Sequence, residues 1–203
     1  MGRELGQSGQ ATLDQVLVIL QQGGDVHRRM HALLEEATQR TPEAAAQRCA
    51  EVARMAQDIE LADVAMKATL MQAQALHQAQ QSTAAAALLR ECVPRLAEQQ
   101  PAAMYLPQAW WTAAQVFDAC GDTGSAITTL AQGNRWILDI ALPRVPEVFR
   151  DSFLQRNATN RATLAAAGRR LDGGWTAAEL TRSCHTSAGL SGHREIVRPI
   201  DLR

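Results

Sequence analysis

The 203-residue chain has a formal net charge of −1, with 46% hydrophobic and 20% charged residues. This length suits one or two compact domains with a sizeable core. No apolar run approaches the roughly 18 residues of a membrane span. A near-neutral charge argues against a nucleic-acid-binding protein, which needs a positive surface to neutralise phosphates. We therefore expect a globular protein whose partners are neither nucleic acid nor membrane.

Alanine is the commonest residue, and together with leucine, glutamine and arginine it gives a composition dominated by good helix formers. Apolar residues recur at helical spacing between capping residues, glycines and prolines. The pattern predicts helices over 13–20, 25–37, 41–57, from 58 or 60 to 80, 82–97, 105–119, 123–142, a short stretch from 146, and 160–170, with Asp25 and Thr41 as caps of the second and third. Pro94 predicts a kink or an early end in the fifth helix. No convincing strand is present, so the fold class should be all-α.

Composition also divides the chain into three parts. Residues 1–10 are polar and glycine-containing, which is typical of a flexible N-terminal tail. Residues 11–171 carry the helical pattern, and residues 172–203 are rich in Thr, Ser, Gly and Arg, as in a loosely ordered C-terminal tail. The N-terminus lacks the apolar stretch of a secretory signal, so the cytoplasm is the expected compartment.

An internal repeat with a period of about forty residues runs through the helical part. A small residue followed four positions later by a larger one recurs as Ala45-x3-Cys49, Ala85-x3-Leu89 and Ala126-x3-Leu130. Each copy lies early in the second helix of a predicted helix pair. Small residues let two helix backbones approach closely, and one pair cannot bury its apolar face alone, so stacked pairs are expected.

The clearest unit contains Trp110-x2-Ala113-Ala114-x2-Phe117, then Gly121-Asp122, then Ala126. This unit resembles a tetratricopeptide repeat, in which two aromatic positions and small residues mark a helix pair. The other units lack the aromatics, and the period exceeds the usual 34 residues, as in the long-helix variants of bacterial regulators. The resemblance implies a right-handed α-solenoid of about three to four stacked antiparallel helix pairs.

The pairing of the helices has a competing interpretation. The apolar stripe of residues 13–20, followed by Gly24-Asp25, also matches the first helix and turn of the clearest unit. Pairing the first two helices would place Arg29 where a small residue is needed. We therefore favour the first helix as a cap on the stack.

The stretch from Val145 to Arg161 is similar to sequence that closes the helical-repeat region of some bacterial signalling ATPases, nucleotide cyclases and LuxR-type transcription regulators. That resemblance implies a sensor or partner-docking module. On physical grounds, Phe149, Phe153 and Leu154 are expected to close the open end of the stack.

Candidate chemistry is weak throughout. His27 and His31 are four residues apart, but Arg28 and Arg29 lie between them and a third metal ligand is not evident. The cysteines Cys49, Cys92, Cys120 and Cys184 form no CxxC pair, and the first three are expected to be small buried hydrophobes. Cys184, His185 and His193 are a weak metal candidate in the C-terminal tail. Neither a nucleophile elbow nor a P-loop is present, so no catalytic, metal-binding or cofactor-binding residue is assigned and an enzyme is not expected.

The residues we favour for partner binding are Trp111, Arg28, Arg29 and Arg135. If Trp110 faces the core, Trp111 points about 100° away and becomes an interface candidate, while arginine side chains suit acidic partners. The expected function is binding of a partner protein or peptide in the groove of the superhelix. The alternative is a bacterial regulatory domain that senses a ligand or peptide, and self-association through the aromatic C-terminal half stays open.

Overall fold

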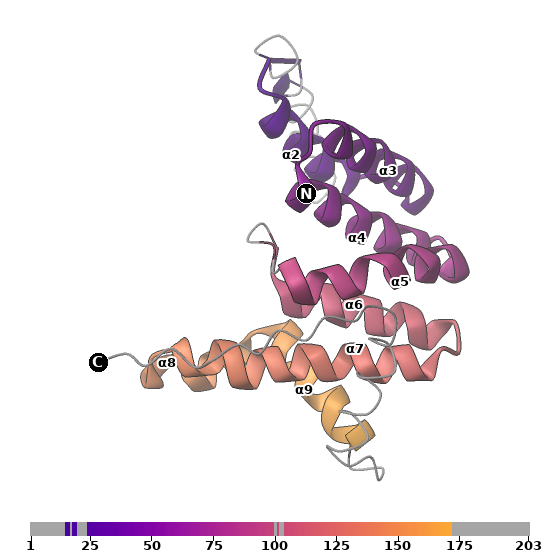
Figure 1. Ribbon diagram of the computed structural model, residues 1–203. Coiled ribbons are helices and arrows are strands. Elements are labelled where there is room, and N and C mark those ends of the chain that lie inside the picture. Colours follow the sequence, from indigo (N-terminus) through magenta and orange to yellow (C-terminus); the bar gives the residue numbers. More distant parts are fainter. Residues whose placement is uncertain (1–14, 17, 20–23, 100, 102–103, 172–203) are drawn as a thin grey trace, which may run out of the picture.

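The computed structural model describes residues 15–16, 18–19, 24–99, 101 and 104–171. These residues form a stack of α-helices with no strand among them, so the predicted all-α class is confirmed (Figure 1). The helices are α2 (Val26–Ala37), α3 (Pro42–Asp58), α4 (Ala62–Gln78), α5 (Ser82–Gln99), α6 (Leu106–Ala119), α7 (Thr123–Arg135), α8 (Glu147–Asp151) and α9 (Ala158–Leu171). Between α7 and α9 lie two π-helical segments, η1 (Trp136–Ala141) and η3 (Ser152–Arg156), and a 3₁₀ turn, η2 (Leu142–Arg144).

Consecutive helices pack against one another in antiparallel fashion from α2 to α7, each lying below the last in Figure 1. The most extensive of these contacts joins α3 and α4, and further contacts link α2 with α4 and α4 with α6. Helix α9 crosses the end of the stack and packs on α7 and α6. In the first half of the chain, the most extensive packing therefore joins α3 to α4, which the predicted pairs α2/α3 and α4/α5 would separate.

The recurring alanines occupy equivalent places, but the recurring unit is a single helix. Helices α3, α4 and α5 begin twenty residues apart, and the fourth residue of each is alanine. The same position in α6 and α7 is also alanine, so the set comprises Ala45, Ala65, Ala85, Ala109 and Ala126. All five are at most 9% exposed. The forty-residue period in the sequence thus corresponds to two helical steps.

Three of the turns between helices share one backbone conformation. Glu60, Gln80 and Gly121 have positive φ angles of 58°, 62° and 74°. In each turn the next residue donates its N–H to a carbonyl five residues earlier, at 2.8 to 2.9 Å. This is the helix-ending arrangement in which a left-handed residue lets the last turn satisfy its own carbonyls.

The helix boundaries follow the predicted caps in part. Asp25 accepts a hydrogen bond from the Arg28 N–H at 3.0 Å and caps α2 as expected. Thr41 precedes α3 without a side-chain capping bond. The predicted starts of the fourth helix were wrong, because the chain turns at Glu60 before α4 begins. The expected early end at Pro94 is also wrong, since α5 continues to Gln99.

A buried carboxylate joins the first two helices of the stack. Glu36 of α2 is 4% exposed and lies between two arginines. It accepts a hydrogen bond from Arg40 Nε at 3.1 Å, and Arg48 Nε of α3 lies 3.1 Å from its second oxygen as an ion pair without hydrogen-bond geometry. Arg48 also bonds Glu51. Because a buried charge requires such partners, this cluster fixes α3 against α2.

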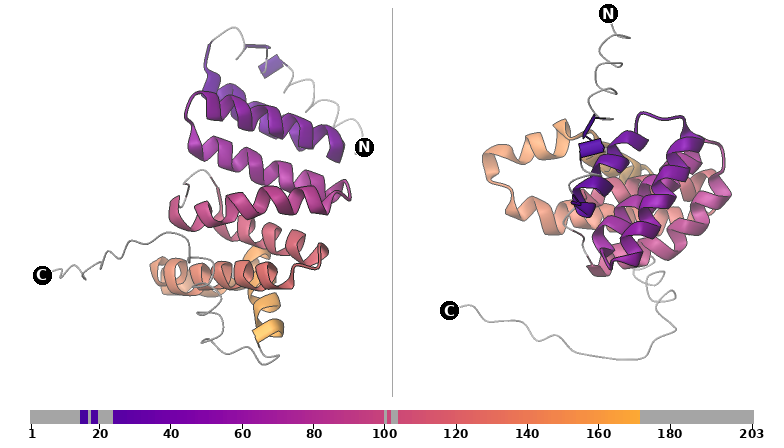
Figure 2. Two further views of the ribbon diagram at one scale, coloured as in Figure 1. Left: turned by 45° about the vertical axis from the view of Figure 1, so that its right-hand side comes forward. Right: turned by 90° about the horizontal axis from the view of Figure 1, so that it is seen from above.

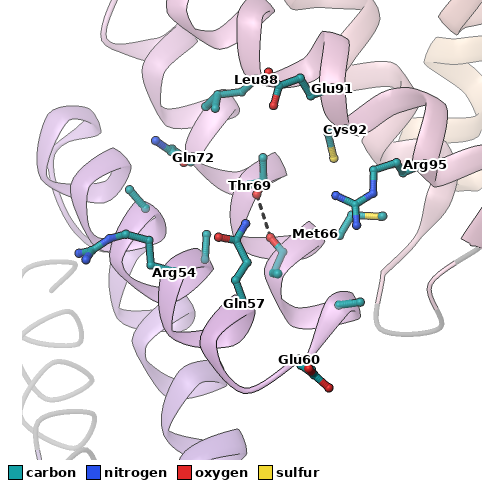
Figure 3. A pocket seen from close by; sticks show the side chains of 14 residues that line it. Arg54, Gln57, Glu60, Met66, Thr69, Gln72, Leu88, Glu91, Cys92 and Arg95 are labelled. Carbon is teal, nitrogen blue, oxygen red and sulfur yellow. Dashed lines mark hydrogen bonds between the residues drawn. The ribbon is translucent and has the colours of Figure 1, made fainter.

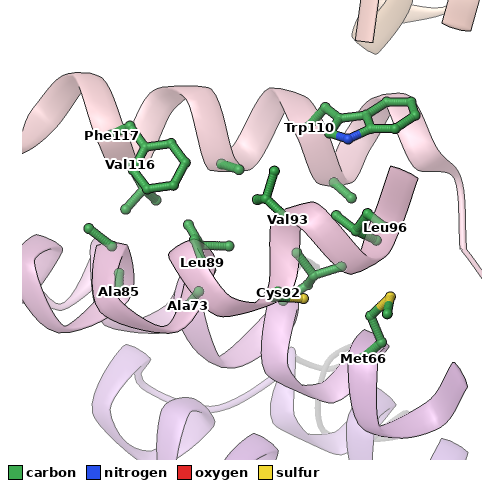
Figure 4. Packing of buried hydrophobic residues seen from close by; sticks show 14 of the residues in the cluster. Met66, Ala73, Ala85, Leu89, Cys92, Val93, Leu96, Trp110, Val116 and Phe117 are labelled. Carbon is green, nitrogen blue, oxygen red and sulfur yellow. The ribbon is translucent and has the colours of Figure 1, made fainter. Parts of the chain in front are cut away.

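The principal core lies between α4, α5, α6 and α7 (Figure 4). Trp110 and Phe117 are 3% and 2% exposed, so both aromatics of the clearest unit face inward as predicted. Small side chains separate the helices elsewhere, and a second core fills the space between α2, α3 and α4. Cys49 and Cys92 are buried as expected, whereas Cys120 is half-buried at the end of α6.

The expected plug at the end of the stack is wrong. Phe149 is 59% exposed and Val148 is 78% exposed, while Phe153 and Leu154 are half-buried. Residues 136–156 (η1, η2, α8 and η3), here called the arm, project sideways from the stack (Figure 2). The end of the stack is covered by α9 instead.

Several expectations concern residues that the structure does not describe. The tails 1–10 and 172–203, and with them Cys184, His185 and His193, lie outside the described residues. Most of the predicted helix 13–20 does as well, and its described residues Val16, Val18 and Ile19 are exposed. Among the described helices, none combines the length and the apolar character needed to cross a bilayer.

Candidate functional site

A groove runs between α3 and α5 over α4 (Figure 3). Its volume is about 500 Å³. We call it the α3–α5 groove; its lining includes Arg54 and Gln57 of α3, Ala62, Ala65, Met66, Thr69 and Gln72 of α4, and Leu88, Glu91, Cys92 and Arg95 of α5, with Glu60 in the turn before α4. Many of these residues are exposed, so the groove is open to solvent.

The groove follows from the way the helices stack. Helix α4 contacts both α2 and α6 on one face, whereas α3 and α5 make no comparably extensive contact with one another on the other. The floor is a stripe of small and polar residues on α4, at positions 62, 65, 69 and 72. Their spacing of three and four residues places them on one helix face. Because Ala62, Ala65 and Thr69 have small side chains, the space between α3 and α5 stays open.

Charged side chains of both signs line the groove walls. Arg54, Glu60, Glu91 and Arg95 are all exposed, and none forms an ion pair with another described residue. Arg95 extends over the groove toward Met66 in Figure 3. These four groups can pair with charges on a bound partner, because none of them is neutralised by an ion pair with another described residue.

The reactive groups of the groove are poorly placed for chemistry. Burial raises the pKa of the Cys92 thiol to about 11, so its thiolate is scarce at neutral pH. The Thr69 hydroxyl donates to the Ala65 carbonyl of its own helix at 2.9 Å. The groove lining contains no histidine. What the arrangement offers is a shaped surface for binding.

The residues predicted to bind a partner do not come together. Arg28 and Arg29 lie on α2, while Trp111 and Arg135 lie on α6 and α7, with three helices of the stack between (Figure 1). Trp111 is half-buried at the seam between α6 and α9, where it packs beside Leu130. The Arg28 side chain, 78% exposed, pairs with Asp25 at 3.2 Å. Arg135 is 81% exposed and lies 4.0 Å from Asp139.

The histidine pair of α2 also has no metal-binding surroundings. The rings of His27 and His31 meet edge to face with centroids 4.7 Å apart. Burial, followed by the positive charge of Lys67, lowers the pKa of the His31 imidazole. No group of three or more metal-ligating side chains occurs among the described residues.

The groove residues Arg54, Glu91 and Arg95 were not predicted from the sequence. One signal was available: positions 62, 65, 69 and 72 form a face of small and polar residues at helical spacing. Such a face on an internal helix indicates a place where no neighbour packs. The charged residues that border this face belong to α3 and α5, and the sequence does not show that these two helices flank it.

Comparison with known proteins gives no match: no family model, no curated protein and no solved structure is detectably similar to this chain. The function must be argued from the residues themselves.

Proposed function

We propose that the chain is a non-catalytic protein-interaction module whose α3–α5 groove binds a helical segment of a partner protein. We further propose that the stack is a right-handed, tetratricopeptide-like solenoid of the kind seen in bacterial regulators. The equivalent alanines at the fourth position of five consecutive helices support a repeat of this type. The observation that carries the binding function is the open groove, with small residues on its floor and unpaired charges on its walls.

The shape of the groove favours a helix over an extended peptide. Its floor, from Ala62 to Gln72, runs along α4 for about 15 Å, which corresponds to about three turns of a bound helix. Small floor residues allow close approach, and packed helices have axes about 8–10 Å apart, depending on the side chains between them. A peptide that binds by strand addition would need an exposed strand edge, and the described residues contain no strand.

The charges specify the partner further. A bound helix should place an apolar stripe on the floor and near Met66 and Leu88. Acidic residues on its two flanks would pair with Arg54 on the α3 wall and Arg95 on the α5 wall, and a basic residue would pair with Glu91. The favoured partner is therefore an amphipathic helix carrying both signs of charge.

A display experiment with the full chain tests the proposal. Helical peptides are selected on the wild-type protein, and their dissociation constants are measured by fluorescence anisotropy. Thr69→Arg, which fills the floor, and Arg95→Glu, which inverts a wall charge, should each weaken binding at least about tenfold, or about 1.4 kcal/mol. Thr38→Arg, at an exposed position outside the groove, is the control and should leave binding unchanged. Equal binding by wild type and both groove variants would refute the proposal.

The same peptides decide the role of the predicted residue Trp111. Its position at the seam between α6 and α9, outside the α3–α5 groove, leads us to expect that Trp111→Ala leaves binding unchanged. A loss of affinity in the folded variant would move the binding site to the α6–α9 seam.

One observation favours the alternative function of ligand sensing. A second pocket of about 280 Å³ lies between α4 and α6, lined by Leu70, Met71, Met104 and Tyr105 with Lys67 at its edge. This volume suits a small apolar ligand with an acidic group. A ligand that raises the melting temperature of the wild type but not of Gln74→Trp, which would fill this pocket, would support sensing over peptide binding.

A further inference from the structure

The arm, residues 136–156, carries three of the exposed large apolar side chains of the described residues, Leu138, Val148 and Phe149. No residue between Ile137 and Asn160 is buried, although this stretch contains Leu138, Leu142 and Phe153. Val148 is 78% exposed and Phe149 59% exposed, and both lie on the return limb of the arm. Exposed apolar residues gathered on one projection indicate a surface that is covered in the working protein.

The two limbs of the arm do not cover one another. They diverge in the view from above (Figure 2, right), and neither α8 nor η3 packs extensively on η1. The closest neighbours of η3 are α8 and α9. A hairpin whose limbs fail to share a core cannot bury its own apolar side chains, so a partner has to do so.

The base of the arm is firmly anchored. Trp136 lies between Tyr105 and Trp110, with ring centroids 6.1 and 6.4 Å away. The fully buried Asn160 donates to the Phe153 carbonyl at 2.9 Å and accepts a hydrogen bond from the Tyr105 hydroxyl. The arm is thus held in position before it meets a partner, which lowers the entropic cost of association.

The balanced charge of the arm is compatible with binding the arm of a second copy of the chain. Three arginines (Arg144, Arg150 and Arg156) are balanced by three acids (Asp139, Glu147 and Asp151), so the arm is neutral and carries both signs. A strongly acidic or basic partner would find little net attraction here, whereas two copies related by a twofold axis can align opposite charges. The arm spans residues 136–156, a length that approaches the about 20–30 residues that each partner contributes to a stable interface.

We propose that the arm is a dimerisation element that pairs with the arm of a second copy of this chain. Two helical hairpins that pack together form a four-helix arrangement, in which the apolar side chains of each limb enter the space between the limbs of the other. This inference does not depend on the proposed peptide-binding groove, which lies on other helices.

Sedimentation velocity of the full chain, over a concentration series, tests the pairing. The wild type should show a monomer–dimer equilibrium. Phe149→Asp on one limb and Leu138→Asp on the other should each raise the dimer dissociation constant at least about 30-fold, as expected for central apolar contacts. Ile59→Asp, at a 48% exposed position in the α3–α4 turn, is the matched control and should dimerise like the wild type.

Two further measurements keep the result unambiguous. Thermal melting by circular dichroism should show that both arm variants are folded at concentrations where all chains are monomeric, with an unchanged melting temperature for Phe149→Asp, because the Phe149 side chain is already mostly exposed. Amide hydrogen exchange in residues 136–156 should slow with rising concentration in the wild type but not in Phe149→Asp. A wild type that stays monomeric throughout, a dimer that survives both arm variants, or a dimer lost in the groove variant Thr69→Arg would each overturn the proposal.

Discussion

Gly133 of α7 provides a sharp test of close helix packing in this protein. A Cβ atom at Gly133 would lie 3.3 Å from the Thr163 Cγ2 of α9 and 3.3 Å from the Trp110 Cβ of α6. Both distances are shorter than an ordinary carbon–carbon contact. The two neighbours belong to different helices, so α7 has little room to move away from both. Gly133 therefore marks a point where three helices meet and a methyl group fits only if its neighbours shift by a few tenths of an ångström.

The expected magnitude comes from two opposing effects. Replacing glycine by alanine inside a helix stabilises it by about 1 kcal/mol, whereas adding a methyl group to a filled core costs about 1–3 kcal/mol. Gly133→Ala should therefore lower the free energy of unfolding by about 1 kcal/mol. Gly168→Ala on α9 is the control, because a Cβ there would meet nothing within 4 Å. That variant should raise the free energy of unfolding by up to about 1 kcal/mol.

Urea denaturation followed by circular dichroism measures both changes, and the two variants should differ by about 2 kcal/mol. Thr163→Ser removes the methyl group that the new Cβ would meet, so the double variant with Gly133→Ala should recover part of the loss in a double-mutant cycle. If Gly133→Ala proves as stable as Gly168→Ala, the three helices do not approach as closely as the argument requires.

Three further predictions follow from the packing and the ionisable groups. Ala85→Leu should lower the free energy of unfolding by about 1–3 kcal/mol through overpacking, whereas Ala87→Leu on the exposed face of the same helix should change it little; equal effects in urea denaturation would contradict the role of the buried alanines. Asp122 caps α7, and its hydrogen bond to Arg90 of α5 lowers the pKa of its carboxyl below the usual 3.8. The ionised carboxylate therefore contributes its full stabilisation of the folded protein above pH 3.8. This contribution is lost as the pH falls through the lower pKa of the folded state. Asp122→Asn should therefore flatten the acid limb of the stability–pH profile, and an unchanged limb would disprove the assignment. Burial raises the pKa of both the Cys49 and Cys92 thiols to about 11, so neither should react with iodoacetamide at pH 8 until urea unfolds the chain; rapid labelling of the native protein, detected by peptide mass spectrometry, would contradict their burial.

The helices could largely be predicted from the sequence because their determinants are local. The Asp25 cap, the start of α3 at Pro42 and the glycine turn at Gly121 are properties of a few neighbouring residues, and the structure shows each of them. The inward direction of Trp110 and Phe117 was also predictable from spacing. Pro94 misled the prediction because packing on both sides of α5 holds the helix together despite one missing hydrogen bond.

The candidate sites were less predictable, since each depends on which neighbour is present. The α3–α5 groove combines residues from three helices, and a single side chain such as Arg95 has no local feature that separates it from other exposed arginines. For Phe149 the prediction of burial was wrong. This aromatic residue near the end of the repeat was expected to close the stack, yet it lies exposed on a projecting limb.

By itself, the sequence determined that the protein is helical, where most of its helices begin and end, and which small residues would be buried between them. Helical periodicity and capping act within a few residues, so they are fully present in the order of the amino acids. The tertiary structure decided that α9 covers the end of the stack, that α3 and α5 leave a groove over α4, and that the arm stands free of the core. Those features depend on whether an element distant in the sequence packs on an apolar face and excludes water from it.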